Sequence, residues 1–253
     1  EMATVIQYPM SNTSWAAPKP ADEGYQIAYS VDADGNSIYT ADMTDEQKYE
    51  AALQASISFF KAAGYTFDEA TGKFTAAPEG AEMTYEVIIP GGGTGDHPAF
   101  GILTAAKEAL ATIGITLQIN DPSDSSVWNN ALEANTAEMW AGAWGATVDP
   151  DMYQVYHSDN ANGKGTNSNH YSIEDADLDE MIIAARNSAD QSYRKATYKE
   201  CLETILDWGV EIPTYQRQNA VVISTERVNV STMTPDITTF WGWTNDIEKL
   251  EMN

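Results

Sequence analysis

The stretch that decides the fold is MTYEVIIPGGGTGDHPAFGILTAAKEALATIGITLQI, residues 83–119. Residues 83–89, which include Val87, Ile88 and Ile89, are predicted to form a strand, and a glycine-rich turn follows it. Apolar residues at helical spacing predict a helix over about 98–113, and alternating apolar residues over 115–119 predict a second strand. Two strands joined through a helix by short turns form a βαβ unit, in which the strands are parallel.

The sequence on both sides of this unit predicts more helices and strands. Thr44 and Gln47 form a capping-box pattern, which predicts a helix from there to about Ala63. Asp190 is expected to cap a later helix over 191–208. The other expected elements are a hairpin over 25–40, a short hairpin over 65–75, helices near 125–134 and 176–187, and strands near 137–144, 210–215 and 220–224. This order predicts an α/β protein with a mixed sheet flanked by helices.

The chain is strongly acidic. Its 253 residues include 38 acidic and 13 basic side chains, which gives a net charge of −25. A surface of this charge repels the phosphates of nucleic acids and anionic lipids, so we expect neither as a partner. No stretch approaches the roughly 18 apolar residues of a membrane-spanning helix. The single cysteine, Cys201, lacks a partner for an internal disulfide and is expected to be buried.

The glycine-rich turn, Gly91–Gly95, lies between a strand and a helix, where phosphate-binding loops occur. It lacks the Lys-Ser/Thr pair of a nucleotide-binding loop, and Asp96 stands where a dinucleotide fingerprint has its third glycine. An acidic side chain at that position would repel a phosphate. We therefore expect a flexible loop, with Asp96 as the N-cap of the following helix.

Signatures of metal binding and catalysis are weak. His97, His157 and His170 do not have the spacing of zinc ligands, and Cys201 has no second cysteine beside it. We expect no metal ion, no cofactor and no catalytic residue. Among 38 acidic residues, however, some pair always resembles the two carboxylates of a glycosidase. A secreted hydrolase that acts on glycans or peptides therefore stays open as the alternative.

The most informative candidate is the segment WAGAWGATVDPD, residues 140–151. It predicts a tryptophan-bearing strand that ends in a glycine and runs into an Asp-Pro-Asp loop. In open α/β sheets, ligands bind beyond the carboxyl ends of the strands. Trp144 would offer an apolar wall there, while Thr147, Asp149 and Asp151 would offer orienting hydrogen bonds. The other possibility is that both tryptophans are core residues that alternate with alanine and glycine.

Six short motifs occur along nearly the whole chain, in one order. They are Phe60–Tyr65, Ala109–Ile115, Trp144–Pro150, the set Asn169, Tyr171 and Asp179, the helix opening Asp190, Arg194 and Tyr198, and Ile212–Tyr215. Through these motifs the chain resembles the C-terminal half, or second lobe, of the extracellular solute-binding proteins of peptide and oligopeptide ABC importers.

The resemblance implies a periplasmic-binding-protein-like lobe from a protein in which two lobes close on a ligand. Residues 1–40 would be a connecting segment and hairpin from the first lobe or hinge, 41–215 the α/β second lobe, and 216–253 a return segment. The first lobe would be missing from this chain. The complete protein would be a monomer that docks on an ABC permease, and it would be extracellular or periplasmic, with a membrane anchor outside this chain.

The resemblance also implies a ligand site. In peptide-binding members an aspartate three residues after the tryptophan pairs with the peptide's amino group, but this chain has Thr147 there. Either Asp149 or Asp151 replaces that aspartate, or the ligand is not a simple peptide with a free amine. The expected ligand-binding residues are Trp144, Gly145, Thr147, Asp149, Asp151 and Asn169. A structural or adhesive surface domain is a third possibility.

Overall fold

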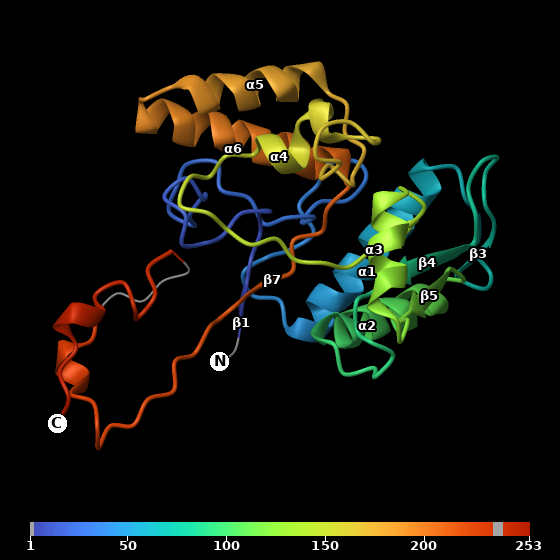
Figure 1. The fold of residues 1–253 in the computed structure, drawn as a ribbon. Helices are drawn as coiled ribbons and strands as arrows, with labels where there is room; N and C mark the ends of the chain where they lie inside the picture. Colours follow the sequence, from blue (N-terminus) through green and yellow to red (C-terminus); the bar gives the residue numbers. More distant parts are fainter. Residues whose placement is uncertain (1–2, 235–239) are drawn as a thin grey trace. The chain divides into compact units, whose positions relative to one another are not determined.

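The computed structural model describes residues 3–234 and 240–253 (Figure 1). The chain divides into two compact units. We call residues 29–143 the sheet unit, and residues 1–28 together with 144–253 the helical unit. The boundary after residue 143 falls inside the region 41–215, which the sequence predicted to be one lobe.

The sheet unit is built on the predicted βαβ unit. Strand β4 (Thr84–Ile88) pairs in parallel with β5 (Thr116–Asn120), and helix α2 (Pro98–Thr112) connects them. Strand β6 (Met139–Trp140) pairs in parallel with the other edge of β4, so the strand order is β5-β4-β6. Residues of α2 pack against buried side chains of β4 and β5, which closes one layer over the sheet.

The rest of the sheet unit consists of helices α1 (Asp45–Ala62) and α3 (Ser125–Glu133) and a hairpin of β2 (Thr66–Asp68) and β3 (Lys73–Ala76). Helix α1 begins with the predicted capping box, in which Thr44 and Gln47 each bond the other's backbone amide. Phe60 of α1 packs edge-on against Tyr65, with ring centroids 4.9 Å apart. These aromatic contacts join the helix to the hairpin.

The helical unit packs two long helices against each other. Helices α5 (Ala176–Asn187) and α6 (Gln191–Trp208) share a core whose members include Leu178, Ile182 and Leu202. The short helix α4 (Tyr153–Tyr156) packs on the same core, and three 3-10 turns complete the unit: η1 (Ser158–Asn160), η2 (Val230–Thr232) and η3 (Ile247–Lys249). Cys201 is fully buried in this core, as predicted.

Two segments that are far apart in the sequence lie side by side in the helical unit. Strand β1 (Ala3–Val5) pairs antiparallel with β7 (Tyr215–Arg217), with Val5 opposite Tyr215. The α/β class is therefore confirmed, but parallel and antiparallel pairs occur in separate sheets rather than in one mixed sheet. The parallel strands come from helical crossovers, whereas the antiparallel pairs come from a local hairpin and from these two segments.

Several predicted boundaries were wrong. The tryptophan strand expected over 137–144 is only two residues long, because β6 has β4 as its one partner and the chain leaves the sheet after Trp140. The hairpin expected over 25–40 is reduced to a single bridge between Val31 and Ser37. All of residues 220–224 are described, and they form no strand.

The N-cap of α2 was also predicted wrongly. His97, not Asp96, is the cap, and its Nδ1 accepts a hydrogen bond from the Ala99 amide at 3.2 Å. Pro98 explains the shift, because proline fits the first helical position and thereby makes the residue before it the cap. Asp96 instead bonds the Thr94 hydroxyl within the glycine-rich turn.

The start of α5 carries a testable pH dependence. The Asp175 carboxylate accepts the amides of Leu178 and Asp177, and the Trp208 indole N–H at 3.0 Å. These hydrogen bonds, chiefly the one from Leu178, hold the pKa of Asp175 below its ordinary value. A lowered folded pKa contributes stability above the unfolded value of about 4, and that contribution is lost as the pH falls through the folded pKa.

We therefore expect Asp175→Asn to lower the unfolding free energy at pH 7, and the gap to the wild type to close as the pH falls below about 4. Asparagine still caps a helix, so the comparison isolates the charge. Urea unfolding between pH 2.5 and 7 measures the gap. A gap that stays constant over this range would contradict the assignment.

Candidate functional site

The segment that the sequence singled out is open to solvent. Residues 144–149 are exposed, and Pro150 is buried where the segment returns to the helical unit. The Trp144 side chain is 44% exposed. A Cβ built on Gly145 would meet no described heavy atom within 4 Å beyond its chain neighbours, so a ligand can approach the backbone there. The possibility that Trp144 is a core residue is thereby excluded.

The other tryptophan of the segment has a different role. Trp140 ends β6 and is half-buried, with its ring edge-on to Trp128 at 6.4 Å. The indole N–H of Trp128 donates to the Ala141 carbonyl at 3.0 Å and thereby fixes the chain at the end of the strand. Trp140 therefore belongs to the packing of the sheet unit, as the alternation with small residues indicated.

Trp144 is held in place although it is exposed. Its indole N–H donates to the Tyr171 hydroxyl at 3.3 Å. Its ring stacks on the ring of His170, with centroids 6.3 Å apart and planes 14° from parallel. One face of the indole therefore has a fixed partner, which gives the segment an ordered apolar surface.

Asp149 forms an ion pair with a firmly anchored arginine. Arg194 Nη2 lies 2.7 and 3.0 Å from the two carboxylate oxygens. The same guanidinium donates to the Ala185 carbonyl at 2.9 Å and to the Tyr198 hydroxyl at 3.2 Å. The hydrogen bond with Asp149 raises the pKa of Arg194, and the pair fixes the segment to α6.

Asp151 and Thr147 are also engaged within the loop. Asp151 lies 3.3 Å from Arg186 Nε and accepts the Tyr153 amide at 3.1 Å. The Thr147 hydroxyl donates to the Asp149 carbonyl at 2.6 Å, so its lone pairs remain available to accept. Each acid of the Asp-Pro-Asp loop thus has an arginine against it, and both acids brace the loop.

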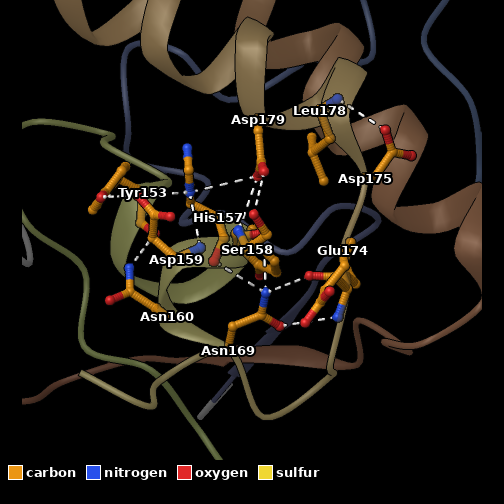
Figure 2. Close-up of polar contacts among 12 residues, drawn as sticks. Tyr153, His157, Ser158, Asp159, Asn160, Asn169, Glu174, Asp175, Leu178 and Asp179 are labelled. Atoms are coloured by element: carbon orange, nitrogen blue, oxygen red, sulfur yellow. Dashed lines mark hydrogen bonds and ion pairs between the residues drawn. The ribbon is translucent and has the colours of Figure 1, made fainter. Parts of the chain in front are cut away.

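Asn169 does not lie on this surface, which corrects the prediction that it contacts the ligand. Its side chain is fully buried. The amide donates to the carbonyls of Tyr156, His157 and Ile173 at 2.9 to 3.3 Å, and its oxygen accepts the Ile173 amide (Figure 2). A buried amide that satisfies several backbone groups is a structural element, since those groups have no water to replace it.

A nearby group of Ser, His and Asp side chains is not a catalytic triad. Figure 2 shows that the Ser158 hydroxyl is directed to Asp179 and not to His157. The Asp179 carboxylate also accepts the Ser158 amide at 2.9 Å. His157 Nδ1 accepts the Asp159 amide at 3.1 Å and so caps η1. A triad requires the serine to donate to the histidine, and this geometry lacks that bond.

The glycine-rich turn binds a carboxylate of its own chain. The amides of Gly93 and Gly95 donate to Asp121 at 3.0 and 3.1 Å, and Asp121 follows β5 directly. A Cβ on Gly91 would lie 2.5 Å from the same carboxylate, so a larger residue there would displace the Asp121 side chain. The place at which a phosphate could bind to the turn is therefore occupied by Asp121.

Sequence reasoning missed a polar contact behind Trp144. The hydroxyl of the buried Tyr156 donates to Glu211 at 2.9 Å, and the ring of Tyr156 stacks on that of Tyr171. Burial raises the pKa of Glu211, and the two tyrosine hydroxyls oppose that rise. The one available signal was an acid placed between Val210 and Ile212 in an otherwise apolar run.

The described residues contain no group of three or more His, Cys, Asp or Glu side chains that could hold a metal ion. Within the same residues, no helix combines the length and apolarity that crossing a bilayer requires.

No protein-family model and no curated protein matches the chain. Solved structures do match. The oligopeptide-binding protein AppA of Bacillus subtilis, solved with a nonapeptide, is 14% identical with a TM-score of 0.58, and the match covers 100% of this chain and 43% of that one. NikZ of Campylobacter jejuni, solved with Ni(L-His), is 18% identical with a TM-score of 0.56 and coverages of 84% and 36%.

The periplasmic binding protein DppA of Helicobacter pylori, solved with the peptide STSA, is 16% identical with a TM-score of 0.54, and the match covers 99% of this chain and 39% of that one. The chain spans less than half the length of each of these proteins. Its fold is therefore similar to part of the fold of AppA and DppA, as the resemblance of the six motifs predicted.

The structural role of Asn169 can be tested. Asn169→Leu keeps the volume but leaves three carbonyls and one amide without their partner, which we expect to cost about 3 kcal/mol of unfolding free energy. Asn187→Ala, at an exposed position at the end of α5, is the control and should change stability by less than about 0.5 kcal/mol. Chemical denaturation measures both. Equal stability of the two variants would contradict the structural role.

Proposed function

We propose that this chain is part of the solute-binding component of an ABC importer and that it holds a peptide or a similar small solute. The observation that carries the proposal is the exposed, ordered segment 144–149, with Trp144 fixed by Tyr171 and His170. It occurs on a fold shared with proteins that were solved with peptides and with a nickel chelate. An apolar wall beside an accessible backbone suits such ligands.

Each residue of the segment has a distinct part in this proposal. Trp144 forms the apolar wall, Gly145 allows the ligand to approach the backbone, and the Thr147 hydroxyl accepts a hydrogen bond from it. Asp149 and Asp151 hold the loop through their arginines. The charge of each acid is thereby balanced, so the segment favours a ligand group that is polar rather than cationic.

No bond is made or broken in this function. The complete protein would close two lobes on the solute, and the closed state would be favoured by contacts that exist only when both lobes touch the ligand. It would be an extracellular or periplasmic monomer, tethered to the membrane by an anchor outside this chain, and would deliver the solute to an ABC permease. Hydrolysis has less support, because both acids of the segment are paired with arginines and Ser158 is directed to Asp179.

The proposed role of Trp144 as an apolar wall leads to the first binding prediction. In the complete protein, Trp144→Ala should weaken the binding of peptides by about tenfold to a hundredfold, because an aromatic contact area is lost. The matched control is Trp208→Ala, since Trp208 is similarly exposed at 48% but lies at the far end of α6. Calorimetry with a pool of tri- to pentapeptides measures both. Equal losses for the two variants would contradict the assignment of Trp144.

The ion pairs of Asp149 and Asp151 with arginines lead to a second binding prediction, which concerns the amino group of the peptide. Acetylating the amino group of a bound peptide should reduce its affinity by less than about threefold, since a lost charge-assisted hydrogen bond would cost more than tenfold. The comparison uses the same peptide with a free and an acetylated terminus. A loss above tenfold that Asp149→Asn abolishes would show that Asp149 binds the amine.

A further inference from the structure

Trp144 is the outermost member of a chain of contacts that runs into the helical unit. Its indole N–H can only donate, so the Tyr171 oxygen must accept it at 3.3 Å. The ring of Tyr171 in turn stacks on the ring of Tyr156.

The inner end of the chain is fixed more firmly than the outer end. Glu211 also accepts the Tyr156 hydroxyl at 2.9 Å, and Tyr156 is buried in the core with α5 and α6. The rings of Tyr156 and Tyr171 stack 5.6 Å apart, with planes 10° from parallel. Tyr156 is thereby held both at its ring and at its hydroxyl, and the ring of Tyr171 is positioned against it.

We propose that Tyr171, held by its stacking contact with Tyr156, is a positioning residue that sets the orientation of Trp144 in the ligand wall. Its expected effect on affinity rests on the proposed function, whereas its effect on the orientation of Trp144 does not. Without the Tyr171 hydroxyl, the contact left to the indole among the described residues is its stacking on His170, which restrains the plane of the ring but gives its N–H no partner.

Glu211 lies close in sequence to the antiparallel strand pair of the helical unit. It lies between the end of α6 at Trp208 and strand β7, which pairs with β1. The contacts that run from Trp144 through Tyr171 and Tyr156 therefore reach the segment that leads into this strand pair. A displacement of that segment would move the carboxylate to which the Tyr156 hydroxyl donates.

The direct test follows the indole N–H of Trp144 in the 253-residue chain. Among its seven tryptophans, the signal of Trp144 is assigned as the one that Trp144→Phe removes from the ¹H–¹⁵N spectrum. Tyr171→Phe keeps the stacked ring and removes only the hydroxyl. We expect it to move this signal upfield and to speed its exchange with water, and Glu211→Gln to do the same to a smaller extent.

The control is Tyr193→Phe, which removes a hydroxyl from an exposed tyrosine on α6. It should leave the Trp144 signal unchanged. If Tyr171→Phe also leaves the signal unchanged, the proposal is overturned, whatever the chain binds.

Affinity in the complete protein gives the second readout, with the tightest-binding member of the tri- to pentapeptide pool as probe. Tyr171→Phe should weaken binding by about three- to tenfold, as expected for one hydrogen bond. In a Trp144→Phe background, where the indole N–H is already gone, it should have no further effect, because the two residues act through one bond. An equal loss in both backgrounds would overturn the proposal. If no peptide binds the wild type, the proposed function fails, and the indole signal alone decides whether Tyr171 positions Trp144.

Discussion

The guanidinium of Arg194 is the point at which the helical unit and its exposed segment are joined. It donates to the Ala185 carbonyl of α5, to Tyr198 on its own helix and to the carboxylate of Asp149, and it lies over the ring of Trp15 at 5.3 Å. An arginine serves this role because its planar fork offers several donors in fixed directions. Four segments of the chain thereby depend on one cation.

This anchoring explains how an exposed loop can have a defined shape. The loop has few buried apolar contacts of its own, so its conformation depends on its ends. Asp149 and Asp151 are held by arginines on α6 and α5, and Pro150 between them is buried. Trp144 is held at the other end by Tyr171. Under the proposed function, the residues between these two ends would bind a ligand without first having to be ordered.

Under the proposed function, the chemistry of the segment also limits the kind of ligand that it would bind. Carboxylates are plentiful in this chain, but those of the loop are balanced by arginines, and Glu211 accepts the hydroxyl of the buried Tyr156. What remains exposed on the segment is an indole face, an open backbone and a hydroxyl. Such a surface would recognise its ligand by shape and neutral hydrogen bonds, and the solved proteins of similar fold hold chemically different solutes.

The sequence by itself determined the α/β class, the βαβ unit around the glycine-rich turn and the capping box at Thr44, and it singled out the segment that begins at Trp144. These features depend on local periodicity and on neighbouring residues, so a linear pattern contains them. Only the tertiary structure decided that Asn169 is buried, that arginines balance the loop acids, and that Glu211 lies behind the wall. Each of these outcomes depends on which residue, distant in the sequence, becomes the hydrogen-bond partner of a given side chain. The spacing of residues along the chain does not specify that partner.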